Sequence, residues 1–346
     1  MIILNSNEYI SEKLNIAPIT KERLGGMRET LVNDRVKKFI KDNNLKWNPN
    51  TRRYDCDGNV IIPDDIDIEV NGRFAINFGL IKGDFWYVDK TLETLDGAPQ
   101  YVGGSFNCSG NKITTLKGAP QYIGGNFFCN NNKLVSLEGA PDIVCGDFHC
   151  FNNQLTSLEY APQELNGYFN CADNKLTSLK YAPKKVGGIC CNGNNLKTLE
   201  GAPQIVNGDF VCRYNNITSL KGAPIEVGGF FDCSGNELET LKYAPQIVKK
   251  SFICSQNHLI TLEGAPQEIG DDGFYCDANN LTTLKGAPQK VNGKFDCRNN
   301  NLTSIEGAPE YISGDFYCSD NTYLKINQLH LTSIHNRIKG KIIHNL

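Results

Sequence analysis

The sequence contains few of the residues and motifs from which an active site or a metal site is usually built. It has only five histidines among 346 residues, and no two cysteines are spaced as C-x-x-C. No phosphate-binding glycine loop, nucleophile elbow or pair of carboxylates at a defined spacing is present. We therefore expect a protein that is not an enzyme, with no catalytic residue, no cofactor and no bound metal.

The first residues, MIILNSNEY, have no basic region followed by a long apolar stretch, the pattern of a secretory signal peptide. This absence predicts a cytoplasmic protein, whose thiols stay reduced. The formal net charge is −3, of which residues 1–46 contribute +3 and residues 322–346 contribute +4, leaving −10 on residues 47–321. An acidic middle repels phosphates. The charge thus disfavours nucleic acid and favours a partner with a basic surface.

Proline and cysteine, by contrast, recur in one register along most of the chain. An Ala-Pro pair returns every 21 residues, with one step of 20 and one of 22, which indicates a repeat architecture. Its eleven prolines are Pro99, Pro120, Pro141, Pro162, Pro183, Pro203, Pro224, Pro245, Pro266, Pro288 and Pro309. Eleven of the fourteen cysteines keep the same interval: Cys108, Cys129, Cys150, Cys171, Cys191, Cys212, Cys233, Cys254, Cys276, Cys297 and Cys318.

One unit reads F-x-C-x-x-N-x-L-x-x-L-x-(G/Y)-A-P. Phenylalanine and cysteine are two residues apart, so both side chains face the same side of a strand. The asparagine three residues after each cysteine has two donor hydrogens and an acceptor, and we expect it to bond backbone groups inside the turn. Proline lacks an N–H and ends the strand pairing. Each unit is therefore predicted to be one coil, with a short strand, a corner and a tight return.

These units resemble leucine-rich repeats. The pattern L-x-x-L-x-L-x-x-N-x-L is matched over roughly residues 80–321, with phenylalanine and cysteine in the two central leucine places. The short period and the L-x-G-A-P return are similar to bacterial effector repeats, and more similar still to leucine-rich-repeat proteins encoded by bacteriophages. The resemblance implies a mainly β solenoid, a horseshoe with short parallel strands on its concave face, but no activity. Ubiquitin-ligase effectors carry a catalytic domain after their repeats, where this chain has only about 25 residues.

Stacked coils would place the cysteines in an internal column of small, soft side chains. Disulfides between neighbours are the alternative, since their Cα atoms would lie within bonding range. An odd number of cysteines and poorly aimed parallel side chains favour reduced thiols. Zinc is disfavoured because no histidine keeps the interval. Cys190 is predicted to face outward, but no histidine or acid is in register to activate it.

The two ends depart from the repeat and are predicted to cap the solenoid, whose end coils would otherwise expose apolar surface. We divide the chain into an N-terminal cap at 1–79, about 12 coils at 80–321, and a C-terminal cap at 322–346. The N-terminal cap is expected to hold a helix that begins at Thr20, is broken or kinked near Gly25 and Gly26, and reaches about Asn43, followed by strands. The apolar face of that helix contains Leu31, Val32, Val36, Phe39 and Ile40.

Within residues 47–78, Ile66, Ile68 and Val70 alternate with acids and predict a strand. A first degenerate coil follows, with Phe85 in the phenylalanine place, Tyr87 in the cysteine place and Lys90 in the asparagine place. The stretch DCDGN, residues 55–59, resembles the start of a calcium loop. It lacks the glutamate at the twelfth place and is interpreted as a turn.

In the C-terminal segment, Leu331, Ile334, Ile338 and Ile342 have helical spacing. We interpret this segment as a capping helix. A basic amphipathic helix that binds membrane or nucleic acid is the alternative, which four basic residues support only weakly. His330 and His335 are interpreted as surface residues.

If phenylalanine and cysteine point inward, the residue between them and its neighbours point outward and form a candidate binding face. This face is rich in aromatic residues and arginine, which supply much of the binding energy in protein complexes. Tolerance of aromatics by strands is the plain alternative. The candidate partner-binding residues are Trp86, Phe128, His149, Phe151, Tyr168, Val211, Arg213, Phe230, Ile253, Tyr275, Asp277 and Tyr317.

Two functions remain open from the sequence. The first is a non-enzymatic protein-binding scaffold or inhibitor, encoded by a phage and directed at a host or anti-phage defence protein. The second is an effector or toxin whose N-terminal region has an activity that the repeats only target. A polar cleft in residues 1–80 would favour the second, and a packed cap would favour the first.

Overall fold

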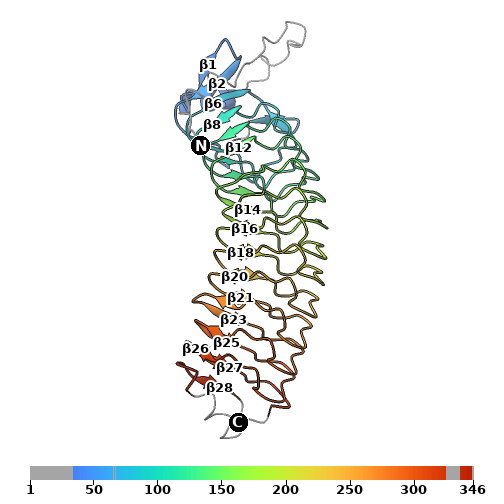
Figure 1. Cartoon of the computed structure of the whole chain (residues 1–346). Helices are drawn as coiled ribbons and strands as arrows, with labels where there is room; N and C mark the ends of the chain where they lie inside the picture. The colour runs from blue at the N-terminus through green and yellow to red at the C-terminus, as the bar shows by residue number, and fades with distance from the viewer. Residues whose placement is uncertain (1–33, 65, 67, 325–335, 345–346) are drawn as a thin grey trace.

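The computed structural model describes residues 34–64, 66, 68–324 and 336–344. The chain winds into a parallel β-solenoid of about 12 turns with little helix, as the repeat predicted. In Figure 1 the coils stack into a long column, with β1 (Lys46–Asn48) near one end and β28 (Ile342–Ile343) near the other. Most strand arrows lie along the left of the column in this view.

A parallel, 14-stranded sheet runs the length of the column and contains the phenylalanine–cysteine strands. Its strands are in register, so that Phe127 lies between Phe106 and Phe148. Besides β28, the strands are β3 (Val60–Ile61), β7 (Phe85–Trp86), β9 (Phe106–Asn107), β11 (Phe127–Phe128), β13 (Phe148–His149), β14 (Tyr168–Asn170), β15 (Gly188–Cys190), β17 (Phe210–Val211), β19 (Phe231–Asp232), β21 (Phe252–Ile253), β23 (Gly273–Tyr275), β25 (Lys294–Asp296) and β27 (Phe316–Tyr317).

Each regular coil also pairs a second short segment, which the sequence analysis did not anticipate. It lies four residues before the phenylalanine, where an apolar residue such as Val102 or Ile123 is buried. These strands are β6 (Phe78–Ile81), β8 (Tyr101–Val102), β10 (Tyr122–Ile123), β12 (Ile143–Val144), β16 (Ile205–Val206), β18 (Glu226–Val227), β20 (Ile247–Val248), β22 (Glu268–Ile269), β24 (Lys290–Val291) and β26 (Tyr311–Ile312).

The core is one continuous column of phenylalanine, cysteine, leucine and isoleucine side chains, nearly all fully buried. Most phenylalanines of successive coils stack, as Phe231 and Phe252 do with centroids 5.5 Å apart and planes 9° apart, whereas Phe127 and Phe148 meet edge-on. All fourteen cysteines are free thiols. The Cys233 thiol points at the carbonyl oxygen of Ile253 in the next coil, at 3.4 Å, and most column cysteines repeat this contact. The sulfurs are therefore aimed at backbone oxygens.

The predicted inward role of the asparagines is confirmed. Nδ2 of Asn153 donates to the carbonyls of Cys150 in its own coil and of Cys129 in the coil before, both at 3.1 Å. Its Oδ1 accepts the N–H of Leu134 at 3.0 Å. Because buried backbone groups need partners, this side chain joins each corner to its neighbour.

The N-terminal region contains α2 (Asp34–Asp42), β1, β2 (Arg53–Cys56), and the hairpin of β4 (Glu69–Val70) and β5 (Arg73–Phe74). The predicted apolar face is confirmed where it is described, since Val36 and Phe39 are buried and Ile40 is half-buried. Thr20, Leu31 and Val32 lie outside the described residues.

The strand expected at residues 66–70 is shorter than predicted. Among the described residues of this stretch, only Glu69 and Val70 are in a strand, because the Ile66 N–H bonds the carbonyl of Pro63 and forms a turn. Cys56 pairs with Ile81 of β6, and Val60 pairs with Phe85. The four-residue offset from Cys56 to Val60 equals that from Ile81 to Phe85. Residues 53–62 therefore form a further coil, and the sheet continues across the expected boundary at 79/80.

At the other end the helical interpretation is wrong for residues 336–344. Ile342 and Ile343 form β28, which pairs in parallel with β27, and Ile338 bridges Ile312. Ile338 and Ile342 keep the same four-residue offset that separates Val102 from Phe106. A four-residue spacing fits one turn of a helix, and it also fits the two paired segments within one coil. This ambiguity explains the error. Leu331 and Ile334 lie outside the described residues.

Candidate protein-binding face

The residue between phenylalanine and cysteine in each coil, with the residues before phenylalanine and after cysteine, forms what we call the ladder face. Side chains alternate between the core and the surface along each strand, so the ladder face lies at the surface, as expected. At β9, Phe106 and the Cys108 that follows the strand are fully buried, and Asn107 between them is partly exposed. The ladder face therefore follows the whole 14-stranded sheet.

Most of the predicted contact residues are accessible on this face. Trp86 and Arg213 are exposed. Val211 is only 7% exposed, because its short side chain lies in register between Cys190 and Asp232. The partly exposed residues are Phe128, His149, Phe151, Tyr168, Phe230, Ile253, Tyr275, Asp277 and Tyr317.

Three of these residues form an aromatic cluster on neighbouring coils, consisting of Phe128, His149 and Phe151. The Phe128 and His149 rings are stacked, with centroids 4.9 Å and planes 5° apart. Phe151 meets His149 edge-on at 6.3 Å. Tyr168 lies on the next strand of the sheet. The register thus assembles aromatic side chains that are 21 residues apart in sequence.

The electrostatics of the cluster centre on His149. Burial lowers the pKa of His149, and the attraction of Asp147 opposes that shift. The His149 Nε2 lies 3.7 Å from the Asp147 carboxylate. Desolvation is the larger effect, so the imidazole favours its neutral form, which suits an aromatic stack.

Next to this cluster, Cys190 is half-buried on β15 and contacts the side chain of Asn192. Burial raises the pKa of the Cys190 thiol. It also raises the pKa of Tyr168, which hydrogen-bonds the same thiol. The expectation that Cys190 is not activated agrees with these shifts.

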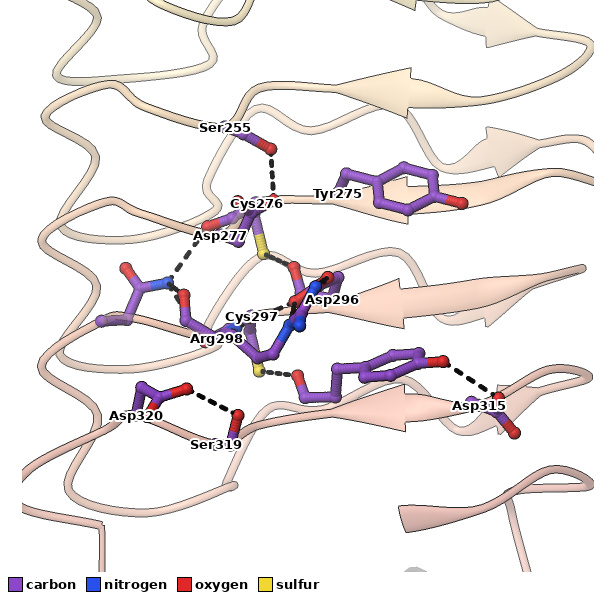
Figure 2. Close-up of polar contacts among 12 residues, drawn as sticks. Ser255, Tyr275, Cys276, Asp277, Asp296, Cys297, Arg298, Asp315, Ser319 and Asp320 are labelled. Atoms are coloured by element: carbon purple, nitrogen blue, oxygen red, sulfur yellow. Dashed lines mark hydrogen bonds and ion pairs between the residues drawn. The ribbon is translucent and has the colours of Figure 1, made fainter. Parts of the chain in front are cut away.

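The C-terminal part of the ladder face is polar (Figure 2). The Arg298 guanidinium donates to both carboxylate oxygens of the buried Asp296, with contacts of 2.6–3.1 Å. Its Cζ lies 5.0 Å from the centre of the Tyr317 ring. The Tyr317 hydroxyl donates to Asp315 at 3.1 Å. This network neutralises Asp296 and holds a tyrosine at the surface.

Several acids of the ladder face have a structural role. Each lies before a phenylalanine, and one carboxylate oxygen accepts the backbone N–H of the next coil. The pairs are Asp84 with Ser105, Asp147 with Tyr168, Asp209 with Phe230, and Asp315 with Lys341, at 2.7–3.0 Å. Acceptor and donor are 21 residues apart in the first three pairs and 26 apart in the fourth. The 21-residue spacing was the signal available in the sequence.

In the described part of the chain, no group of three or more His, Cys, Asp or Glu side chains is arranged to hold a metal ion. Within that same part, no helix has the length and apolar character needed to cross a bilayer. The stretch DCDGN spans the end of β2 and its connection to β3, and the Asp57 carboxylate pairs with Lys46 and Lys82. These two lysines lower the pKa of Asp57 to about 2. His330 and His335 lie outside the described residues.

Comparison with known proteins identifies the fold. No protein-family model and no curated protein sequence matches the chain. The leucine-rich repeat domain of APL1B is similar in structure, with a TM-score of 0.52 and 14% identity over 77% of this chain and 81% of that one.

Two bacterial proteins are more distant in structure. YopM from Yersinia enterocolitica has a TM-score of 0.38 and 16% identity over 76% of this chain and 73% of its own. InlJ from Listeria monocytogenes, whose functional domain includes a cysteine ladder, has a TM-score of 0.43 and 18% identity over 76% of this chain and 62% of its own. The likeness to the APL1B domain, together with the repeat, shows that this chain has the leucine-rich-repeat fold, built from units of about 21 residues.

Proposed function

We propose that this protein is a non-enzymatic scaffold or inhibitor that binds another protein through its ladder face. The aromatic cluster of Phe128, His149 and Phe151 carries the proposal. Its rings are partly exposed on a rigid parallel sheet, so that binding orders few side chains. Clustered aromatic residues of this kind are typical binding hot spots.

The charge of the same face favours a basic partner surface. Asp147 and Asp315 each use one carboxylate oxygen for a backbone N–H. The second oxygen of Asp147 lies 3.7 Å from His149 Nε2, and that of Asp315 accepts the Tyr317 hydroxyl. The two arginines of the face are close to buried acids: Arg298 pairs with Asp296, and Arg213 lies 3.9 Å from Asp232. The net potential of the face is therefore set by the remaining acids.

The free thiols of the cysteine column suit a reducing cytoplasm. The similarity of the L-x-G-A-P…F-x-C-x-x-N units to phage-encoded repeats supports a phage product in the bacterial cytoplasm. Its target there is a host or anti-phage defence protein.

A role for the N-terminal region beyond capping has one observation in its favour. A recess of about 480 Å³ is lined by polar residues, among them Asp42, Asn44 and Asn59. The carboxylate at its edge, Asp57, is held by two lysines, and the Cys56 thiol bonds the carbonyl of Asn43. Phe39, on the same helix as Asp42, is buried in the core. We therefore assign the described part of this region to capping.

A pull-down from bacterial lysate tests the proposal with two variants, each of which loses exposed apolar surface. In the first, Phe128, Phe151 and Tyr168 are changed to alanine. In the second, Val135→Ala and Ile260→Ala truncate exposed residues outside the ladder face.

A protein retained by wild type and the second variant, but lost with the first, supports the proposal. The melting temperatures of both variants should stay near that of wild type. Equal retention by both variants would show that the ladder face does not bind.

A further inference from the structure

The residue before each Ala-Pro pair has a left-handed backbone in all eleven units. Eight units place glycine there, with φ between 83° and 94°, as glycine readily allows. Three place tyrosine there, and these are Tyr160, Tyr181 and Tyr243, with φ of 70° or 71°. A bulky side chain in this region is a conformational outlier. The tyrosines therefore oppose the local backbone preference.

Space is also limited at this corner. A Cβ on Gly201 would lie 2.5 Å from the backbone nitrogen of Lys180, and a Cβ on Gly222 would lie 2.6 Å from the Cα of Glu200. The tyrosines gain little burial in return, since Tyr181 is 44% and Tyr243 53% exposed. Residues held in an unfavourable backbone conformation, with no gain in packing to offset it, concentrate at functional sites.

The residue directly before the glycine or tyrosine position is charged in every unit. Its contacts distinguish two of the tyrosine units from the glycine units. Lys180 and Lys242 precede Tyr181 and Tyr243. Their Nζ atoms lie 4.7 and 5.0 Å from the ring centres. Lysines at the same position of three other units form ion pairs with glutamates one coil away. These pairs are Lys117 with Glu138, Lys221 with Glu200, and Lys285 with Glu263.

Within the described residues, neither Lys180 nor Lys242 has a carboxylate at ion-pair distance. Each Lys–Tyr pair thus presents a cation beside an aromatic face. Such a site has the charge to bind a carboxylate and the apolar surface to bind the chain that bears it.

We propose that the Lys180–Tyr181 and Lys242–Tyr243 pairs anchor a second binding surface, which takes an extended acidic segment of another polypeptide. The anchors are three coils apart, about 14 Å at a strand spacing of ~4.8 Å. An extended chain rises about 3.3 Å per residue, so carboxylates four residues apart reach both anchors. Gly201 and Gly222 place no side chain between them. This surface is separate from the ladder face and does not depend on its function.

Two isolated carboxylates fit this corner better than a nucleic acid backbone does. Glu200 lies between the two anchors in the same column and is paired with Lys221. Glu159 and Glu263 flank the anchors one coil outside them. A continuous row of phosphates would meet these acids, whereas two spaced carboxylates would not.

Fluorescence anisotropy with labelled ten-residue peptides in a threonine–valine background tests the surface. The first peptide has two glutamates four residues apart, the second has them two apart, and the third replaces both by lysine. We expect the first to bind wild type at least fivefold more tightly than the second, and the third not to bind. Lys180→Ala and Tyr243→Gly should each weaken the first peptide at least fivefold, and Lys285→Ala should not.

The proposal is overturned if the first peptide does not bind, if spacing has no effect, or if Lys285→Ala weakens binding as much as Lys180→Ala does. Tighter binding of a labelled oligothymidine would overturn the assignment to a polypeptide. As a further readout, Tyr181→Gly and Tyr243→Gly should leave the melting temperature unchanged or higher, because they relieve the left-handed backbone. A clear decrease would show that the rings are there for packing.

Discussion

The side-chain amide nitrogen of Asn215 lies 3.1 Å from the carbonyl oxygen of Cys191, one coil before it. The same amide donates to Cys212 in its own coil at 3.0 Å, and its oxygen accepts the N–H of Leu196 at 3.0 Å. These buried backbone groups have no access to water. One side chain therefore satisfies the polar groups at the corner of two coils.

Replacing Asn215 by alanine should destabilise the protein by about 3 kcal/mol or more, because each buried group left without a partner costs roughly 1–3 kcal/mol. Urea unfolding followed by circular dichroism measures the change. Asn216→Ala, at the neighbouring exposed position, is the matched control and should stay near wild type. A loss below about 1 kcal/mol at Asn215 would mean that water replaces the amide.

The thiols should differ sharply in reactivity. Cys145 is exposed and Cys190 is half-buried, whereas the eleven column cysteines are buried. We expect a thiol reagent to label Cys145 rapidly in the native protein and all fourteen cysteines in denaturant without reductant. Mass spectrometry of the labelled peptides gives the count. Fewer than about twelve reactive thiols in denaturant would indicate disulfides.

Stability should fall at alkaline pH because of the same column. Burial raises the pKa of Cys318 to about 12, and it raises the pKa of Cys233 and the other column thiols as well. Unfolded thiols titrate near pH 9. The unfolded chain therefore releases protons that the folded chain keeps, and stability is full below pH 9 and decreases above it.

Urea midpoints measured from pH 7.5 to 10.5 check this decrease. Cys233→Ala should be less stable at neutral pH but should lose less stability per pH unit, because one titrating thiol is gone. Equal slopes for wild type and variant would exclude the thiols as the cause.

Mild acid should act through His149. Its pKa is lowered in the folded state from a usual value of 6.5, so the unfolded state binds the proton more readily. The resulting loss of folding stability is absent above pH 6.5 and grows as the pH falls below 6.5. Melting temperatures at pH 7.5, 6.5 and 5.5 should decrease less for His149→Phe, which keeps the stack on Phe128, than for wild type. Parallel curves would contradict this prediction.

The last coil should protect the end of the core. Ile338 is buried and bridges Ile312, and β28 covers the edge of β27. Ile338→Asp places a charge in this apolar site and should expose Phe316 and the strand edge, which favours aggregation. Light scattering on heating should rise earlier than in wild type. Lys339→Gln, at an exposed position, is the control; identical scattering by both variants would show that this coil is dispensable.

Much of this architecture could be predicted from the sequence, because the same pattern of residues recurs in eleven units. The two-residue offset of Phe106 and Cys108 determined which side chains are buried. The asparagine three residues later could be given its role because an amide that both donates and accepts suits a corner with unpaired carbonyls. Accessibility on much of the ladder face was predictable for the same reason. The exceptions include Val211, Asp232 and Asp296, which lie between phenylalanine and cysteine but are buried, because neighbouring strands and side chains cover them.

Only the tertiary structure decided the ends and the contacts between coils. A four-residue spacing such as that from Ile338 to Ile342 fits a helix and a coil equally well locally, and pairing with β27 selects the coil. The stack of Phe128 on His149 and the bond from the Tyr168 N–H to Asp147 join residues 21 apart. Such contacts depend on the register between strands, and register is a property of stacked coils that no single unit contains.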